Sequence, residues 1–388
     1  MISHFIFFLE IVSATGALAG IAYYVLCLWS ARQFLRYRTS AQGDPALHWP
    51  GVSILKPLKG VDPAIYESFC SHCVQDYPEY EIIFGVSEAD DPAVAVVERL
   101  QREFPERKIH LVVCPNRLGT NLKVSNLVQM LPHARYDYLI VNDSDIRVAP
   151  DYLRRVLAPL AQPTVGMVTS LYRGVPEATL GSRLESLGIS TDFAGGVLVA
   201  RSLEGVRFGL GSTLAFRRVE LSRIGGFEAL LDYLADDYQL GQRIAALGLE
   251  VRLSEVIVDT FLPAYDFRAF FEHQLRWARS VRDSRRWGYA GMVLTYGLPW
   301  ALLALVVARG AWWAVALLLA TIALRLAVAT IVGLNVLQDR FVVRLLSLIV
   351  LRDLVAVAVW CASFGSDTIA WRGSHFHLRN GKLSPADS

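Results

Sequence analysis

Two long apolar runs near the ends of the chain constrain its fold more than any other feature. The first, from Phe5 to Trp29, carries Glu10 as its only charge and exceeds the ~20 residues that a helix needs to cross a bilayer. The second runs from about Met292 to Phe364. A chain that is 53% hydrophobic and only 19% charged is also too apolar for an ordinary soluble protein. We therefore predict an integral membrane protein with transmembrane helices at both ends.

The sequence between these runs reads as a soluble domain. The predicted parts are an N-terminal transmembrane anchor at 1–35, a linker at 36–50, an α/β domain at 51–290, C-terminal transmembrane or interfacial helices at 291–366 and a basic tail at 367–388. The first run is longer than the ~7–15 apolar residues of a signal peptide, so we expect it to be retained. Breaks near Arg309-Gly310 and between Gln338 and Arg344 predict two or three C-terminal helices, which leaves the side of the tail open.

Basic residues flank the predicted domain at both membrane boundaries. Arg32, Arg36 and Arg38 follow the first run, and "RWARSVRDSRRW" precedes the second. By the positive-inside rule, the domain faces the cytoplasm. The membrane accounts for these basic clusters and the net charge is only +2, so no nucleic-acid partner is expected. Arg325 and Asp353 lie inside apolar stretches, where charge is costly, and we expect them to face protein or water.

Within the domain, short apolar runs alternate with helical patterns. The predicted strands are 51–58, 80–87, 108–114, 137–143 and 164–172, and a helix is predicted at 91–104. Continuous apolar strands suit a mostly parallel sheet that helices cover on both faces, so the fold class is α/β. Five cysteines include a lone C-x-x-C, Cys70 to Cys73, which favours reduced thiols in a cytosolic domain over a zinc site.

Acidic clusters follow two of the predicted strands. Glu88, Asp90 and Asp91 close the second, and Asp143 and Asp145 close the fourth. Ligands of an open α/β sheet gather at the carboxyl ends of its strands, so the clusters are expected to meet there. The Asp143–Asp145 pair could hold a hard divalent ion together with a diphosphate.

Other interpretations of these motifs exist. Asp-Ser-Asp is also typical of a surface turn. A haloacid-dehalogenase-type phosphatase begins with the same pattern but needs Thr or Val where this chain has Arg147. "GLGST" (209–213) lacks the third glycine of a dinucleotide motif, and the sequence contains no P-loop.

A third acidic site lies in the stretch 233–248, where Asp236 and Asp237 occupy the N-terminus of a predicted helix. Asp236 and Asp237 could cap that helix, or one could act as a general base with a raised pKa. Downstream, the amphipathic basic stretch 270–287 carries Arg276 and Trp277. It could lie on lipid headgroups, or Arg276 could stabilise a leaving diphosphate while Trp277 walls the sugar or acceptor pocket.

The order of these motifs resembles that of the family 2-like processive and lipid glycosyltransferases with a GT-A fold. More narrowly it resembles the ceramide glucosyltransferase family, glycosyltransferase family 21, and within it the bacterial hopanoid-biosynthesis branch. The stretches that carry the resemblance are "VSILKPLKGVDP" (52–63), "QDYPEYEIIFGV" (75–86), "GTNLKVSNL" (119–127), "DSDIRVAPDYL" (143–153) and "LADDYQLG" (234–241). "MLPHARYDYL" and "HQLRWARS" are closest to the hopanoid branch. The resemblance runs from the N-terminal anchor to "DTIAWRGSHFHLRNGK".

The resemblance implies roles for individual residues. It assigns the donor nucleotide to Pro57, Glu88, Asp91, Lys123 and Asp143, a metal to Asp143 and Asp145, and catalysis to Asp237, with Asp236, Arg276 and Trp277. The implied cofactor is Mg²⁺ or Mn²⁺, and the implied donor is a UDP-sugar. The chain departs from the family motif at His273, where Gln or Arg is usual, and animal relatives lack an acidic residue at the position of Asp145.

The resemblance also implies an inverting reaction at the bacterial inner membrane. The expected activity is transfer of N-acetylglucosamine to the hopanoid bacteriohopanetetrol, with transfer of glucose to ceramide as the alternative. Two interpretations from other classes remain: a non-catalytic membrane protein that senses sugar nucleotides on the same fold, and a structural membrane protein whose acidic clusters are turns and caps.

Overall fold

The computed structural model describes residues 2–40, 49–371 and 374–385. Contacts divide the chain into two compact units. The helical unit comprises Met1–Tyr37, Pro176–Leu203 and Ala264–Asn380, and the α/β unit comprises Arg38–Val175, Glu204–Pro263 and Gly381–Ser388. The predicted linker lies mostly outside the described residues, and its first part is helical because α1 (Ile2–Ser40) extends to Ser40.

The α/β unit is built on an eight-stranded mixed sheet with the order β3-β2-β1-β4-β7-β6-β8-β5. The strands are β1 (Val52–Leu58), β2 (Tyr80–Val86), β3 (Lys108–Val113), β4 (Tyr138–Val141), β5 (Ile146–Arg147), β6 (Val165–Val175), β7 (Leu214–Arg217) and β8 (Glu250–Phe261). The first four in the order are parallel, β6 and β8 are parallel to each other, and β7 and β5 are antiparallel to their neighbours. The predicted α/β class with a mostly parallel sheet is confirmed.

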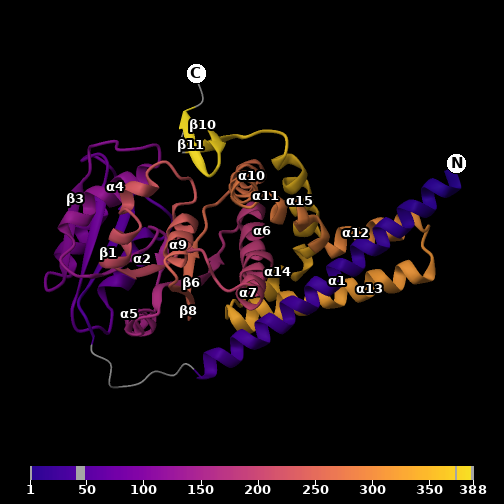
Figure 1. The fold of residues 1–388 in the computed structure, drawn as a ribbon, viewed down its shortest axis with the longest axis horizontal. Coiled ribbons are helices and arrows are strands. Elements are labelled where there is room, and N and C mark those ends of the chain that lie inside the picture. Colours follow the sequence, from indigo (N-terminus) through magenta and orange to yellow (C-terminus); the bar gives the residue numbers. More distant parts are fainter. Residues whose placement is uncertain (1, 41–48, 372–373, 386–388) are drawn as a thin grey trace. The chain divides into compact units, whose positions relative to one another are not determined.

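Helices cover both faces of this sheet (Figure 1). They are α2 (Ile65–Cys73), α3 (Ala93–Glu103), α4 (Leu122–Met130), α5 (Tyr152–Leu157), α8 (Arg218–Arg223) and α9 (Asp236–Ala246), with short 3-10 turns at Leu131–His133, Ala158–Ala161 and Phe227–Leu230. Side chains of α2, α3 and α5 share one buried core with alternate residues of β1 and β2, such as Ile54 and Phe84. On the other face, Gly85 leaves the space that Met130 of α4 fills.

The helical unit contains the N-terminal helix and most of the C-terminal part of the chain. Its elements are α1, α6 (Leu180–Gly188), a π-helical turn (Ile189–Phe193), α7 (Ala194–Leu203), α10 (Phe267–Ser284), α11 (Arg286–Gly291), a 3-10 turn (Met292–Thr295), α12 (Gly297–Val307), α13 (Trp312–Val328), a π-helical segment (Ala329–Val336), α14 (Phe341–Leu345), a 3-10 turn (Leu346–Leu348), α15 (Ile349–Ser363), β9 (Thr368–Trp371) and β10 (Ser374–Arg379). Pro176–Leu203 belongs to this unit although it lies inside the predicted 51–290 domain.

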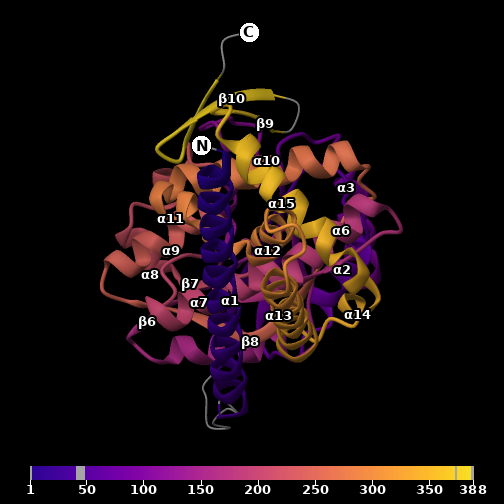
Figure 2. The same cartoon turned by 90° about the vertical axis from the view of Figure 1, so that its right-hand side faces the viewer.

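Close contact between small residues packs α1 against α12. A Cβ atom at Gly20 would lie 2.1 Å from the Cα of Gly297, and one at Gly16 would lie 2.5 Å from the ring of Trp300. Small residues permit such approach between helices in a membrane. Both views in Figures 1 and 2 show α1 running beside α12 and α13.

Among the described residues, two helices are long and apolar enough to cross a membrane: His4–Arg38 and Trp312–Val336. A third candidate is the bent pair Arg286–Thr295 and Gly297–Val307, whose axes differ by 52°. Apolar helices long enough to span a membrane therefore lie near both ends, as predicted. The predicted break near Arg309-Gly310 separates α12 from α13, and Gln338, with a positive φ of 56°, follows the π-helical segment.

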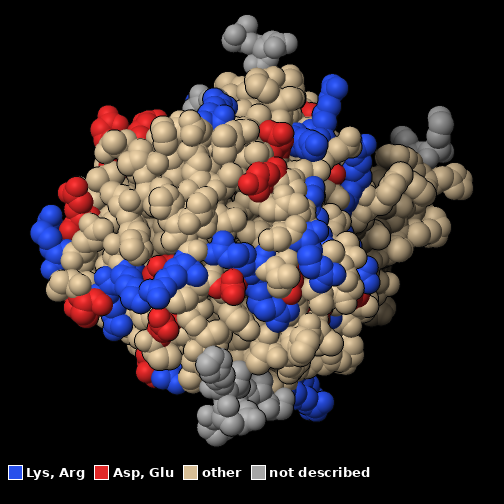
Figure 3. Space-filling view, turned by 60° about the vertical axis from the view of Figure 1, so that its left-hand side comes forward, with Lys and Arg blue, Asp and Glu red and all other residues tan. Residues whose placement is uncertain are grey.

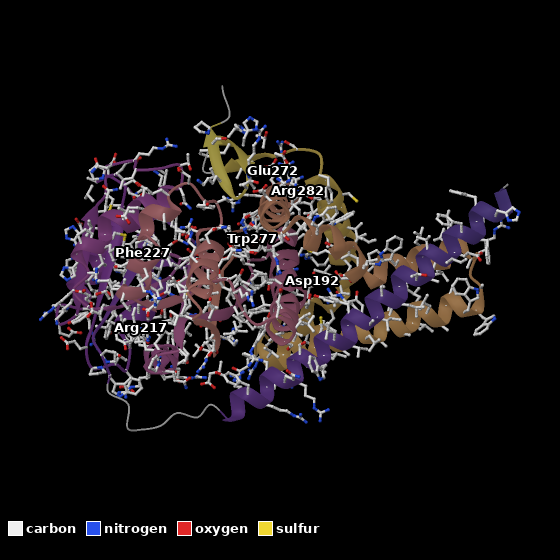
Figure 4. All side chains as sticks on the ribbon, in the orientation of Figure 1. Asp192, Arg217, Phe227, Glu272, Trp277 and Arg282 are labelled. Carbon is white, nitrogen blue, oxygen red and sulfur yellow. The ribbon has the colours of Figure 1, made fainter. Side chains whose placement is uncertain are left out.

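Arg325 and Asp353 face protein, as expected. Arg325 is 2% exposed, and its Nη2 lies 2.8 Å from Asp353 Oδ1 and 2.6 Å from Asp192 Oδ1. These three residues come from α13, α15 and the π-helical turn that Asp192 marks in Figure 4. One buried cation thus joins three segments of the helical unit.

The outer surface carries charges of both signs. Exposed ion pairs of the α/β unit include Arg154–Asp76 at 3.1 Å and Lys108–Glu79 at 3.6 Å. Figure 3 shows acidic and basic side chains close together on one face of the molecule. Exposed pairs of this kind contribute little to stability, so the buried charges are the more informative ones.

Candidate active site

Three neighbouring parallel strands end at one edge of the sheet and gather most of the predicted site residues there. β1, β2 and β4 lie side by side and point the same way. Pro57 lies at the end of β1, Glu88 and Asp91 follow β2, and Asp143 follows β4. Since β7 is antiparallel to β4, its start lies beside the end of β4 and brings the loop 209–213 to the same edge. The strand ends therefore meet as the topology requires.

Asp91 holds the loop that follows β1. Both of its carboxylate oxygens accept the backbone N–H of Gly60 at 3.0 Å, and Oδ1 also accepts that of Ala93 at 2.9 Å. The residue is 5% exposed. Glu88, in contrast, is exposed and pairs with Lys59 at 3.3 Å. Asp91 thus shapes the edge of the site, and Glu88 presents its carboxylate to solvent.

Lys123 joins two of the acidic clusters. It lies in the first turn of α4, whose N-cap residue Asn121 accepts the backbone N–H of Val124. The Lys123 Nζ lies 2.7 Å from Asp143 Oδ1 and 3.3 Å from Asp236 Oδ2. Burial alone would lower the pKa of Lys123, but the carboxylates of Asp143 and Asp236 outweigh burial and raise it. The ammonium group therefore stays charged between them.

Asp143 and Asp237 approach the same glycine. The Gly211 N–H donates to Asp237 Oδ2 at 2.8 Å, and the Gly211 carbonyl accepts the Asp143 N–H at 3.3 Å. A Cβ atom at Gly211 would lie 2.6 Å from Asp143 Oδ2 and 3.4 Å from Asp237 Oδ2. Both carboxylates therefore lie against one Cα, and only glycine leaves them this room.

The surroundings of Asp237 favour a proton acceptor. Burial raises the pKa of Asp237 to about 6, the neighbouring Asp236 adds to the rise, and Lys123 opposes it. The N-cap residue of α9 is Ala235, and both carboxylates lie in the first turn of the helix, where Asp237 Oδ1 also accepts the backbone N–H of Tyr238 at 2.7 Å. A carboxylate that is ionised at neutral pH but more basic than an ordinary Asp is suited to general-base chemistry.

Asp143 pairs with Lys123, whereas Asp145 forms no ion pair within the described part of the chain. It precedes β5 and accepts the hydroxyl of Thr260 on β8. Burial raises its pKa to about 7, and the Asp143 carboxylate adds to the rise. The fully buried Lys56 donates to the backbone carbonyl of Asp143 at 2.9 Å, and burial lowers the Lys56 pKa to about 7.

The Asp143–Asp145 pair fits a divalent ion as part of a diphosphate complex. Both residues offer the hard oxygen ligands that Mg²⁺ and Mn²⁺ prefer. In the part of the chain that the structure describes, no group of three or more His, Cys, Asp or Glu could hold a metal. An ion here would take its remaining ligands from water and phosphate oxygens. Burial raises the pKa of Asp145, and the Asp143 carboxylate adds to the rise; a cation bound between the two would offset this second contribution.

Arg276 and Trp277 lie on α10 of the helical unit, whereas the carboxylates belong to the α/β unit. The ring of Trp277, labelled in Figure 4, lies 4.9 Å from that of His273. His273 stacks on Tyr265 at 5.4 Å, and its Nδ1 lies 3.1 Å from Oε1 of the buried Glu185. His273, the departure from the family motif, therefore links α10 to α6 and supports the ring of Trp277.

Three residues of this edge escaped the sequence reasoning: Lys56, Asn142 and Gly211. Asn142 is fully buried, and its Nδ2 donates to the Ser212 carbonyl at 2.6 Å and to the Tyr152 hydroxyl at 2.9 Å. These bonds hold the loop that carries Gly211 against the end of β4. Lys56 and Asn142 are polar residues near the ends of apolar strands, and this pattern could have identified them from the sequence.

The comparisons with known proteins cover most of the chain. The family described as Glycosyl transferase family 21 matches residues 12–384. Ceramide glucosyltransferase 1 of Caenorhabditis elegans is 27% identical over 220 residues, which are 56% of this chain and 47% of that protein. An N-acetylglucosaminyltransferase of Rhizobium leguminosarum bv. viciae is 25% identical over 162 residues, 39% of this chain and 37% of that protein. The chain spans about half the length of the ceramide glucosyltransferases that it matches first.

A solved structure shares the fold. The mannosyltransferase PcManGT from Pyrobaculum calidifontis, in complex with GDP-Man and Mn²⁺, superposes with a TM-score of 0.56 and 22% sequence identity. The similarity covers 90% of this chain and 98% of that one. It confirms the predicted GT-A fold.

Proposed function

Because the chain belongs to glycosyltransferase family 21, we propose that it transfers a sugar from a UDP-sugar to a hydroxyl group of a membrane lipid. The observation that carries the proposal is the meeting of Asp143 and Asp237 at Gly211, with Lys123 bridging Asp143 to Asp236. The Asp237 carboxylate, the proposed base, thus lies close to Asp143, which we assign to the donor diphosphate. Apolar helices long enough for a bilayer supply the route for a lipid acceptor.

In the proposed reaction Asp237 takes the proton from the acceptor hydroxyl. The oxygen attacks the anomeric carbon, its new bond forms as the bond to UDP breaks, and the configuration inverts. The raised pKa of Asp237 supports this role, since a stronger base takes the proton more readily. Asp236 keeps that pKa high and also pairs with Lys123.

The donor diphosphate is assigned to the end of β4. A divalent ion held by Asp143 and Asp145 would neutralise charge on the departing UDP. Lys123 pairs with Asp143, so its ammonium group could bind a phosphate oxygen of a donor held at Asp143. We assign Arg276 to the leaving diphosphate and Trp277 to the wall of the sugar or acceptor pocket. Nucleoside contacts are assigned to Pro57, Glu88 and Asp91, the last by shaping the loop after β1.

For the substrates, we propose N-acetylglucosamine as the sugar and the hopanoid bacteriohopanetetrol as the acceptor. The name of the rhizobial relative, N-acetylglucosaminyltransferase, supports the sugar. The stretches "MLPHARYDYL" and "HQLRWARS", which resemble the hopanoid-biosynthesis branch, support the acceptor. The alternative is transfer of glucose to ceramide, which the ceramide glucosyltransferase relatives favour.

We propose that the α/β unit faces the cytoplasm of a bacterial inner membrane, where UDP-sugars are made. Arg32, Arg36 and Arg38 at the end of α1 support this side. The C-terminal strand β11 (Lys382–Pro385) belongs to the α/β unit and pairs beside Tyr233, so the chain returns to the side it left. An even number of crossings after Pro263 follows, which the bent pair and Trp312–Val336 supply. With α1, the proposed total is three membrane crossings.

The test is an assay of the purified protein in detergent. UDP-N-acetylglucosamine or UDP-glucose is supplied with bacteriohopanetetrol or ceramide, and products are identified by mass. We expect N-acetylglucosaminyl-bacteriohopanetetrol as the main product. Glucosylceramide instead would replace the proposed substrates with the alternative pair, and no product with any combination would contradict the proposed activity.

A further inference from the structure

The C-terminal strand β11 lies in a different unit from the elements that precede it. The chain leaves the helical unit through the antiparallel strands β9 and β10 and then turns at Asn380 and Gly381, whose φ values are 51° and 79°. Asn-Gly with two positive φ values is typical of a tight two-residue turn. The basic tail predicted at 367–388 is therefore partly a structural element of the α/β unit.

β11 adds a short strand to the segment that leads into α9. The Leu383 N–H donates to the Asp232 carbonyl at 2.7 Å, and the Leu234 N–H donates to the Gly381 carbonyl at 3.0 Å. Between these bonds Tyr233 forms an antiparallel bridge with Lys382. Leu383 is 4% exposed, and the other three residues of the strand are exposed. The strand is thus anchored by its backbone and by one buried side chain.

The start of α4 holds the same segment from another direction. The Thr120 N–H and hydroxyl both lie 3.1 Å from Asp232 Oδ1, and the hydroxyl also lies 3.4 Å from the Leu383 carbonyl. Asn121 Nδ2 donates to the Tyr233 carbonyl at 2.7 Å and to Asp236 Oδ1 at 3.3 Å. Residues 232–234 are therefore clamped between β11 and the residues that precede Lys123.

We propose that β11 is a positioning element that sets the place of Asp236 and Asp237. The inference rests on the proposed function, because it assigns β11 to the geometry of the proposed base. Only Ala235 separates the clamped segment from Asp236, so a shift of residues 232–234 moves the start of α9. A misplacement of about 1 Å can cost ~100-fold in rate even when its cause is remote from the reacting atoms.

The test compares two variants that loosen the clamp with two controls. Leu383→Ala removes the buried anchor of β11, and Thr120→Val removes the hydroxyl that joins Asp232 to Leu383. Ser384→Ala changes an exposed residue of the same strand, and Leu100→Ala removes a buried side chain of α3 in the core on the other side of the sheet from α4. For each variant kcat, KM for the UDP-sugar, UDP affinity and thermal midpoint are measured.

We expect Leu383→Ala to lower kcat by ~10-fold or more and Thr120→Val by a few fold, with UDP affinity and KM for the donor changed less than about twofold. Leu100→Ala should lower the thermal midpoint but not kcat per folded enzyme, and Ser384→Ala should change neither. Wild-type kcat in both clamp variants overturns the inference. So does a result in which Leu100→Ala loses as much kcat as the clamp variants for the same drop in thermal midpoint, because the loss would then reflect stability alone. If Leu383→Ala does not fold, Thr120→Val decides alone. An inactive wild-type protein overturns the proposed function itself, which the same assay reveals first.

Discussion

The Lys123 ammonium group lies 2.7 Å from Asp143 Oδ1 and thereby connects the end of a parallel strand to the start of a helix. The same group lies 3.3 Å from Asp236. One cation therefore compensates carboxylates that reach the site from distant parts of the sequence. Lys123 also lowers the pKa of Asp237, which helps to keep the proposed base ionised.

Replacement of this cation should change the pH dependence of transfer. In Lys123→Gln the pKa of Asp237 rises above its value of about 6, because the cation no longer offsets the effects of burial and Asp236. The acid limb of a plot of log kcat against pH then moves to higher pH, and kcat at pH 7 falls by roughly 10-fold. Lys108→Gln, which removes an exposed lysine near Glu79, is the control and should leave the profile in place. An unchanged profile in Lys123→Gln would contradict the electrostatic role.

Asp237 itself should determine the acid limb in the wild-type enzyme. Only the ionised carboxylate can accept a proton, so kcat is expected to rise with pH through about 6 and then level off. Asp237→Asn should lower kcat by ~10²–10⁴-fold, the range typical of a general base. UDP binding, measured by calorimetry, should persist in this variant. Full activity of Asp237→Asn would remove Asp237 from the proposed role.

Gly211 should tolerate no side chain. Its Cβ in Gly211→Ala would lie 2.6 Å from Asp143 Oδ2, which forces that carboxylate or the loop to move. We expect kcat to fall by ~100-fold, the cost of about 1 Å of misplacement. Gly291→Ala is a matched control, because no atom lies within 4 Å of a Cβ there. Comparable activity in both variants would show that the carboxylates need no such contact.

The sequence revealed the parts of the fold that depend on local pattern. The predicted runs at 51–58, 80–87 and 108–114 became β1, β2 and β3, because apolar runs between polar helices suit a parallel sheet. The rule that ligands gather at strand ends then placed the acidic residues at one edge. The roles assigned to these residues stay predictions, since geometry alone does not test chemistry.

Long-range contacts lay beyond such patterns. Lys56 meets the Asp143 carbonyl 87 residues away, and Thr120 meets Leu383 at a separation of 263. Neither pairing is indicated by periodicity or composition, although Asp143 by itself is. Residues 176–203 read as an ordinary part of the domain, but their buried Glu185 and half-buried Asp192 pair with His273 and Arg325 of the helical unit. Only the folded chain identifies such partners.

The pairing of β11 in the α/β unit predicts the topology of the chain. If the C-terminus shares the side of that unit and α1 crosses once, the N-terminus lies on the opposite side. A C-terminal green fluorescent protein fusion should be fluorescent, whereas an N-terminal alkaline phosphatase fusion should be active in the periplasm. If a green fluorescent protein fused to the N-terminus were fluorescent and an N-terminal alkaline phosphatase inactive, α1 would not cross in this way.

The buried arginine of the helical unit should matter for stability. Arg325→Leu removes the 2.8 Å partner of the buried Asp353, and an uncompensated buried charge costs about 3–5 kcal/mol. Asp192 loses its 2.6 Å partner as well but keeps Arg352 at 3.6 Å. The double variant Arg325→Leu/Asp353→Leu should regain part of this loss, because the buried carboxylate that lost its partner is gone. Arg268→Gln, which breaks an exposed 2.9 Å pair with Glu272, should cause no measurable change. Unfolding in detergent, followed by circular dichroism, measures all three. A single variant as stable as the wild type, or a double variant no better than the single, would mean that the charges of the network are not coupled.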